Sequence, residues 1–577
     1  MNTAELGRLS RTVVQLRPAQ LGQRVRLRAQ RTMLDRSVPL AARWLLAGPR
    51  PAAGPGWPAG FLPVDSCLWS DSQTAKALRA GELLLIGVPR VLVKTVQAGD
   101  VHWAGADWEA ADAPLLWRFH LYYWDWAWAL AAQPPPSDAP AVFAAMWRSW
   151  HSAIALGRGQ AWHPYPAALR AWSFCGIYRH LVAGGPVEAS FRAELAAHAG
   201  FLRRNLETDV GGNHLIKNLK ALVGLAVFFG DDGMLTSSLR RLDRQLAVQV
   251  LPDGGHYERA PAYHCQVLAD LIDVAGLLRA GGHGEPNGLG EAIAMMRGWL
   301  GAVLAPEGSV PLLNDGFPVS PELLALVAPA APPASPLRVL RDTGLARITA
   351  GWWHVLADIG PPCPDDLPAH AHADTFSCVV HVDRAPLLVD TGTSTYAAGQ
   401  VRDRERSTAA HNTVEVDHRD STEVWGAFRA GRRARVAGVS ARAAARTVTV
   451  EAAHDGYRNL PGRPVHRRRW TVDPDELRVD DEVTGRGRHR VTVRWHLAPG
   501  TGLRLVPGGA VVTTMAGEIR VTVAASSEPV LNAATAQLAV GFGATVSAPV
   551  LVCTLRPELP ARISTRWRRA EPRQEPT

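Results

Sequence analysis

The side chains best suited to chemistry in this chain gather within residues 369–417. The stretch contains His370 and His372, then Asp390, and it closes with His411. Short runs rich in Val and Leu separate these residues and predict neighbouring strands. His370 and His372 would share one face of a strand. Two histidines and an aspartate at the ends of adjacent strands match the ligand types of Zn²⁺. Spacing alone leaves ordinary hydrogen-bonded histidines as the alternative, because His-x-His pairs are common by chance.

Two further polar segments lie earlier in the chain. In the first, Gly-Gly-Asn213-His214 opens an apolar helical pattern, so Asn213 is a candidate helix N-cap. The second segment, residues 252–264, holds more functional groups than a turn needs, which predicts a site there. Its functional side chains are His256, Tyr257, Glu258, Arg259, Tyr263 and His264.

The elements that must position these groups differ between the two halves of the chain. Residues 115–279 have apolar positions at helical spacing and short connections rich in Pro and Gly. This pattern predicts helical hairpins packed side by side, in a toroid or a solenoid. Trp and Tyr are concentrated here. Most are expected in the core, although such rings also stack on sugars.

From about residue 337 the sequence consists of short segments in which apolar and polar residues alternate. These segments predict a large antiparallel β-sandwich. A Pro/Ala-rich linker, PAAPPASP, precedes it. The predicted organisation is a basic lead-in at 1–110, a helical domain at 111–325, a β-sandwich at 336–565 and a tail at 566–577.

Length and composition fit a multidomain globular protein. The chain has 577 residues, 47% hydrophobic and 20% charged. A net charge of +9 suits an acidic partner, such as a polyanionic glycan, nucleic acid or a membrane surface. Charge alone does not choose among these partners. Six cysteines without a CxxC pair indicate neither a disulfide framework nor a cysteine-type zinc site.

The first 50 residues carry ten arginines against Glu5 and Asp35. They contain no apolar core of a signal peptide, and no run in the chain approaches the length of a membrane span. A solvated helical face or a contact with a membrane surface or an anionic polymer would both fit this segment. The expected location is cytoplasmic or at the inner membrane, with the periplasm possible.

A family resemblance joins these motifs. The segments NHLIKNLKALV, DGGHYERAPAYH, HAHADTFSCVVHVD, LLVDTGTSTY and RSTAAHNTVEVD resemble the heparinase II/III family of polysaccharide lyases. The resemblance covers about residues 110 to 500. It implies an α/α toroid followed by an antiparallel β-sandwich, with the active site between them. LYYWDW and WHPYP further resemble a bacterial subgroup associated with exopolysaccharide gene clusters.

The resemblance implies β-elimination on an acidic polysaccharide that contains uronic acid; nucleic acid is not an expected partner. Such a reaction needs a group that neutralises the carboxylate, a base for the C5 proton and an acid for the leaving oxygen. The matching residues are Asn213 with His214 as neutralisers, Tyr263 as acid or base, and His370 as candidate base.

Other matching positions imply supporting roles. Metal ligands are implied at His372, Asp390 and His411, for a zinc ion that is chiefly structural. Substrate contacts are expected at Tyr257, Glu258, Arg259, Tyr396 and Arg406. Lys217 and Lys220, one helical turn apart, could face the glycan or simply be solvated.

Two other functions remain compatible with the sequence. One is a zinc hydrolase in which the metal keeps an open position for water. The other is a non-catalytic glycan-binding or assembly protein of an exopolysaccharide pathway. The missing signal peptide sets the chain apart from secreted lyases of the family and favours polysaccharide assembly or turnover over extracellular degradation.

Overall fold

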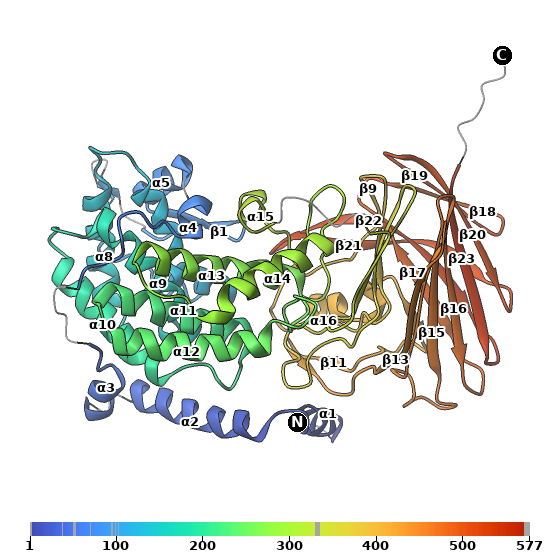
Figure 1. Ribbon diagram of the computed structural model, residues 1–577, viewed down its shortest axis with the longest axis horizontal. Coiled ribbons are helices and arrows are strands. Elements are labelled where there is room, and N and C mark those ends of the chain that lie inside the picture. Colours follow the sequence, from blue (N-terminus) through green and yellow to red (C-terminus); the bar gives the residue numbers. More distant parts are fainter. Residues whose placement is uncertain are drawn as a thin grey trace, which may run out of the picture.

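The chain folds into a helical domain and a β-rich domain that lie end to end (Figure 1). The computed structural model describes residues 3–36, 39–49, 54–69, 71–93, 96–97, 100–101, 103–328 and 335–570. The predicted Pro/Ala-rich linker falls largely outside the described residues. The order of the two domains agrees with the predicted toroid followed by a sandwich.

The helical domain is built from antiparallel helices around α11 (Gly212–Phe229), which packs against α9 (Pro164–Leu181), α12 (Asp232–Gln249) and α13 (Pro261–Ala280). The other helices of this domain are α6 (Leu115–Tyr123), α7 (Trp128–Ala131), α8 (Ala139–Ala153), α10 (Glu188–Arg204), α14 (Asn287–Val303) and α15 (Pro321–Val327). Helix α11 is capped by Gly230, whose φ of +66° suits a residue without a side chain.

Tryptophan side chains fill the core of the helical domain. Trp124 contacts Trp108, Trp126 and Trp150 through stacked or edge-to-face rings, and all four are almost fully buried. Trp172 packs against Trp57 from the lead-in. The prediction that most of these aromatic residues form the core is therefore confirmed.

The lead-in contains more regular structure than its sequence suggested. Three basic helices come first, α1 (Thr3–Val13), α2 (Pro18–Asp35) and α3 (Pro39–Leu45). They are followed by α4 (Val64–Leu68), α5 (Ser72–Arg79) and the short strands β1 (Glu82–Leu85), β2 (Val88–Val91), β3 (Val96–Gln97) and β4 (Asp100–Val101).

Three antiparallel sheets form most of the β-rich domain within the described residues. The first has the order β5 (Leu337–Leu340), β6 (Leu345–Ala350), β7 (Trp353–Asp358), β8 (Cys378–Val382) and β9 (Ala385–Leu388). The second has the order β10 (Val414–Val416), β17 (Val491–His496), β22 (Ala544–Leu555) and β21 (Val530–Gly541). The third has the order β13 (Val436–Ala443), β14 (Val448–His454), β15 (Val465–Val472), β16 (Glu476–Thr484), β23 (Ala561–Arg569), β20 (Gly517–Ala525), β19 (Gly509–Thr514) and β18 (Gly502–Val506). Helix α16 (Gln400–Arg406) and the short strands β11 (Val424–Trp425) and β12 (Arg429–Ala430) lie in the connection after the first sheet.

Alternating burial along the strands creates the core of this domain. Strand β23 continues to Arg569, beyond the predicted end of the domain at residue 565. The reason is that the alternation persists and buries Trp567 completely. The core also holds a buried ion pair, in which Arg468 donates to both oxygens of Asp481.

Candidate active site at the junction of the two domains

The predicted catalytic residues come from both domains. Asn213 and His214 lie in the first turn of α11, and Tyr263 lies in the first turn of α13. His370 lies in the loop between β7 and β8 of the sandwich. The structure therefore brings residues 157 positions apart in the sequence, from Asn213 to His370, into one site.

Glycine is required where α11 begins. Gly211 and Gly212 have φ values of +74° and +56°, a region that L side chains rarely occupy. A Cβ on Gly212 would also collide with the Glu258 carboxylate. The two glycines allow the start of the helix to approach Glu258 closely, and the Asn213 backbone N–H donates to Glu258 Oε1 at 2.6 Å.

Glu258 connects two of the predicted catalytic residues. Asn213 Nδ2 lies 3.3 Å from its Oε1 and 3.0 Å from its Oε2, and His370 Nε2 lies 2.9 Å from Oε2. The Glu258 side chain is buried. Burial would raise its pKa, but the hydrogen bond and charge of His370 lower the pKa to about 2. Glu258 is therefore an ionised clamp between Asn213 and His370.

A second buried carboxylate holds the other side of the His370 ring. His370 Nδ1 lies 2.9 Å from Asp315 Oδ2, and His372 Nε2 lies 2.9 Å from Asp315 Oδ1. Arg402 donates to both oxygens of Asp315, at 2.5 and 2.8 Å. Burial opposes the ionised form, yet Arg402 and the two histidines hold the pKa of Asp315 well below its usual range. Burial lowers the pKa of His370, but hydrogen bonds to Asp315 and Glu258 outweigh it and raise that pKa to about 9.

Tyr263 lies directly against His370. Their rings stack with centroids 4.0 Å apart, and the Tyr263 hydroxyl lies 2.7 Å from the hydroxyl of Tyr396. Burial and the neighbouring Tyr396 raise the pKa of Tyr263 well above its ordinary value. Tyr263 is therefore a neutral phenol at neutral pH, with Tyr396 from the sandwich as its hydrogen-bond partner.

The predicted carboxylate neutralisers lie beside this pair. The two Glu258 oxygens share one hydrogen of the Asn213 side-chain amide. The second amide hydrogen is therefore free for another acceptor. His214 is about one-third exposed, with Nδ1 3.1 Å from Glu207 Oε1 and its ring 4.2 Å from that of Tyr165. The buried Glu207 therefore fixes the orientation of the His214 ring.

The predicted substrate-binding residues divide into two groups. Tyr257 and Tyr396 are half-buried. Tyr257 lies beside Gly211, and the Tyr396 hydroxyl bonds to that of Tyr263, a predicted catalytic residue. Glu258, Arg259 and Arg406 instead form hydrogen bonds or ion pairs within the protein. Arg259 donates to the carbonyls of Pro361 and Asp342, and Arg406 donates to those of Ala371, Gly426 and Arg429. These three side chains hold loops and neighbouring groups in place, which does not support the expected sugar contacts.

Lys217 and Lys220 do not face solvent. Lys217 pairs with Asp270 at 2.7 Å, and Lys220 pairs with Asp270 and Asp273 at 2.8 and 2.6 Å. These short bonds between largely buried groups neutralise both lysines, so neither of the two predicted environments is found.

The expected zinc ligands are close together but do not converge on one point. The His372 and His411 rings are 5.3 Å apart, and His372 Nδ1 and His411 Nε2 are buried without a protein partner. Asp390 uses Oδ2 for His411 Nδ1, at 2.9 Å, and Oδ1 for the backbone N–H of Gly392. Among the residues that the structure describes, no three His, Cys, Asp or Glu side chains are arranged to hold a metal ion. The free donors are therefore His372 Nδ1 and His411 Nε2, while both oxygens of Asp390 accept hydrogen bonds within the protein.

Sequence reasoning missed the residues that orient the catalytic groups. Asn314 and Asp315 lie near the end of the predicted helical domain, and Arg402 lies between two of the family-like segments. No role was predicted for these three residues or for Glu207. Asn314 accepts from the backbone N–H of His372 and donates to the carbonyl of Arg259. Asn314 and Asp315 could have been recognised from the sequence Asn-Asp-Gly, which predicts a polar turn directly after an apolar run.

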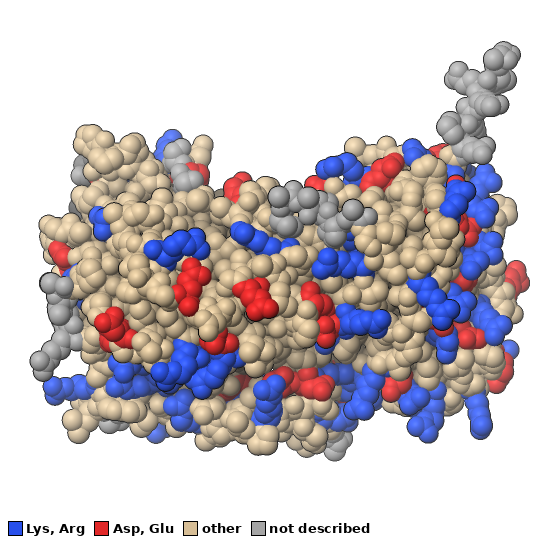
Figure 2. All heavy atoms as spheres, in the orientation of Figure 1, with Lys and Arg blue, Asp and Glu red and all other residues tan. Residues whose placement is uncertain are grey.

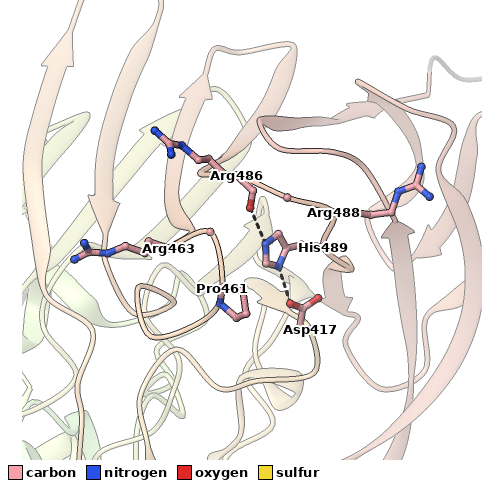
Figure 3. Close-up of a pocket in the computed structure, with 8 residues that line it drawn as sticks. Asp417, Pro461, Arg463, Arg486, Arg488 and His489 are labelled. Carbon is pink, nitrogen blue, oxygen red and sulfur yellow. Dashed lines mark hydrogen bonds and ion pairs between the residues drawn. The ribbon is translucent and has the colours of Figure 1, made fainter.

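A separate pocket lies in the sandwich, with a volume of about 850 Å³ (Figure 3). His489 lies between Asp417 Oδ2, at 2.6 Å, and the carbonyl of Arg486. The side chains of Arg463 and Arg488 point away from each other. None of the predicted catalytic residues lines this pocket.

Sequence models of one protein family match both domains. The model described as "Heparinase II/III N-terminus" matches residues 99–328, and "Heparinase II/III-like, C-terminal" matches residues 332–558. The chain belongs to the heparinase II/III family. This membership assigns it to the polysaccharide lyases, which are carbon–oxygen lyases.

Individual relatives agree with this assignment at the level of the fold. FtsZ-localized protein C of Caulobacter vibrioides is 27% identical over 505 residues, or 81% of this chain and 84% of that protein. The crystal structure of heparinase III aligns with a TM-score of 0.73 at 17% identity, covering 92% of this chain and 90% of that one. A heparan sulfate lyase from Pedobacter heparinus aligns with a TM-score of 0.60 at 15% identity, covering 88% and 84%. The two structural matches confirm the predicted fold.

Proposed function

We propose that this family member cleaves a uronic acid-containing acidic polysaccharide by β-elimination. The observation that carries the proposal is the convergence of Asn213, Tyr263 and His370 through Glu258, in contact with Tyr396 from the second domain. These residues supply an amide donor, a phenol and an imidazole within one buried cluster. They are the three functional types that elimination from a uronate needs.

Each residue is proposed to act at a defined atom of the sugar. The free hydrogen of Asn213 Nδ2 and the adjacent His214 donate to the uronate carboxylate, which stabilises the enolate formed when C5 loses its proton. Tyr263 is a neutral phenol, the state required to protonate the oxygen that leaves C4. The base is His370 or Tyr263, depending on which face of the sugar carries the C5 proton. Either group must first lose a proton, because the His370 ring is charged between Glu258 and Asp315 and Tyr263 is a neutral phenol.

Glu258 and Asp315 are proposed as positioning residues. They hold His370 from both sides and do not touch the sugar in this assignment. Preorganising catalytic groups in this way removes motion that would otherwise have to be lost in the transition state.

An ultraviolet assay tests the proposal. Elimination creates a C4–C5 double bond that absorbs in the ultraviolet, so purified protein would be incubated with a panel of uronate polysaccharides, including the exopolysaccharide of the producing strain. Tyr263→Phe, His370→Ala and Asn213→Ala are expected to abolish the absorbance change. Arg463→Ala, in the separate sandwich pocket, is the matched control and should leave it intact. New reducing ends without absorbance would indicate hydrolysis and would overturn the lyase assignment.

A non-catalytic assembly role is the second candidate. It is favoured by the likeness to a protein named for its localisation with FtsZ, over 81% of this chain. In the same assay, glycan binding without any double bond or new reducing end would support this candidate.

Zinc binding at His372, Asp390 and His411 remains a separate proposal, and no catalytic step is assigned to the metal. Its support is the pair of unpartnered histidine nitrogens. It requires Asp390 to release His411. Elemental analysis of the purified protein, with His411→Ala for comparison, tests it.

A further inference from the structure

The three N-terminal helices form a strap along one edge of the molecule, spanning both domains (Figure 1). Helix α1 is held on the sandwich side, where Arg11 pairs with Glu423 at 2.6 Å and Trp425 donates to Thr12. Helix α2 touches both halves of the chain, because Gln20 Nε2 donates to the carbonyls of Asp209 and Asp366. We call α1, α2 and α3 the N-terminal strap. Its contacts fix which faces of the helices point outward.

The outward faces carry exposed apolar side chains. In α2, Gln20, Leu27, Gln30 and Leu34 are buried against the protein. On the opposite face, Leu21, Val25 and Met33 follow at intervals of four and eight residues, and Val25 is 72% exposed. The outer apolar stripe comprises Leu6, Leu21, Val25, Met33 and Leu40, with Val14 in the turn after α1. Trp44 of α3 is also exposed, although the Arg204 guanidinium lies 4.9 Å from its ring. Together these are seven of the 21 exposed large hydrophobic side chains in the described part of the chain, a concentration that marks an interaction surface.

The charge of the strap also differs between its two faces. Two arginines at the contact with the protein are paired: Arg17 with Asp366 at 3.0 Å and Arg24 with Asp209 at 3.9 Å. The exposed arginines beside the apolar stripe are Arg26, Arg28, Arg36 and Arg43. Within the described ranges, no carboxylate forms an ion pair with any of these four. Figure 2 shows Lys and Arg side chains gathered along this edge of the molecule.

We propose that the N-terminal strap is a peripheral membrane-binding surface for a bilayer leaflet that contains anionic phospholipids. Apolar side chains on one helical face can enter the boundary between head groups and acyl chains, while flanking arginines pair with phosphates. An acidic polysaccharide would satisfy the arginines but would leave Leu6, Val25 and Leu40 in water. The stripe and the charges together therefore select a lipid surface.

The strap would bind parallel to the membrane surface. No helix in the described residues is long and apolar enough to cross a membrane. The strap instead lies flat along the molecule, which suits contact along its whole length. This inference does not depend on the proposed lyase activity.

Vesicle co-sedimentation of the full chain tests the inference. The probes are vesicles of phosphatidylcholine alone and of phosphatidylcholine mixed with phosphatidylglycerol. Wild-type protein should sediment only with the anionic vesicles. The double variant Leu21→Asp and Val25→Asp should weaken binding about tenfold or more, because it places charges at the apolar boundary. Arg26→Glu with Arg28→Glu should weaken binding and reduce its sensitivity to salt.

The matched control is Met515→Asp with Val530→Asp, which changes two exposed apolar residues of the sandwich that are 99% and 59% exposed. It should bind vesicles like the wild type. Circular dichroism and thermal melting would show that all variants are folded. Equal vesicle binding by wild type and the Leu21/Val25 variant would overturn the inference. Wild-type protein that does not sediment with anionic vesicles would also overturn it. If that protein binds a soluble acidic glycan, and the Arg26→Glu/Arg28→Glu variant does not, the strap binds glycan instead of lipid.

Discussion

If Glu258 holds Asn213 and His370 in place, its substitution should have a different effect from that of a residue that binds substrate. Glu258→Gln keeps the shape of the side chain but removes its charge. Two residues contact the Glu258 carboxylate, Asn213 and His370. The backbone N–H and side-chain amide of Asn213 and the charged ring of His370 are all hydrogen-bond donors. Glutamine can offer only one acceptor oxygen, so its own NH₂ group must face one of these donors.

The magnitude follows from the contacts that are lost. A hydrogen bond between charged groups contributes about 1.5–3 kcal/mol, and a buried donor left without a partner costs about 1–3 kcal/mol. Together these effects predict a loss of about 3–5 kcal/mol in the free energy of unfolding, the range found when one partner of a buried ion pair is removed. Displacement of His370 or Asn213 by about 1 Å should lower kcat about 100-fold, with little change in KM.

Two measurements check this prediction. Chemical denaturation gives the free energy of unfolding, and the ultraviolet assay gives kcat and KM on the glycan that the panel identifies. Glu285→Gln, at an exposed ion pair with Arg279, is the matched control and should change neither. If Glu258→Gln raises KM and leaves kcat unchanged, Glu258 contacts the substrate and the clamp argument is refuted. An unchanged free energy of unfolding would refute it independently.

Three further predictions concern backbone, ion pairing and charge. Gly212→Ala should abolish activity and destabilise the fold, measured by thermal melting, because the added Cβ meets Glu258 at a φ of +56°. Asp481→Asn should lower the free energy of unfolding by about 3–5 kcal/mol at neutral pH, because it leaves Arg468 buried without its carboxylate. The pKa of Asp481 is lowered to about 2, so in the wild type this stabilisation is complete above pH about 4 and is lost as the pH falls toward 2; denaturation at several pH values would show this window. Lys217→Ala should leave the KM for the glycan unchanged while lowering stability, because the ammonium group is paired inside the protein.

The sequence allowed the two domains and the principal catalytic candidates to be predicted. Helical periodicity and strand alternation persist over long segments, and burial enforces both patterns, as the exact alternation up to Trp567 illustrates. Asn213, Tyr263 and His370 were identified through short motifs, and their convergence required the tertiary structure.

The supporting residues could not be predicted from local patterns. Glu258 and Arg259 were expected to bind sugar, because a charged residue in a polar loop gives no sign of its partner. The partners of Glu258 are Asn213, 45 residues before it, and His370, 112 residues after it. The partners of Arg259 are the carbonyls of Pro361 and Asp342. Lys217 was ambiguous for the same reason, since Asp270 lies on another helix. Long-range pairing of buried charges leaves little trace in sequence spacing.

Glu258 and Asp315 also explain why the candidate active site depends on both domains. Glu258 and Asp315 precede the sandwich in the chain, whereas His370, His372 and Arg402 belong to it. Separating the domains would break the ion pairs that Glu258 and Asp315 form with His370, His372 and Arg402. Docking of the domains and assembly of the His370 site are therefore a single event. The same charges that orient the His370 ring also stabilise the contact between the helical and β-rich halves.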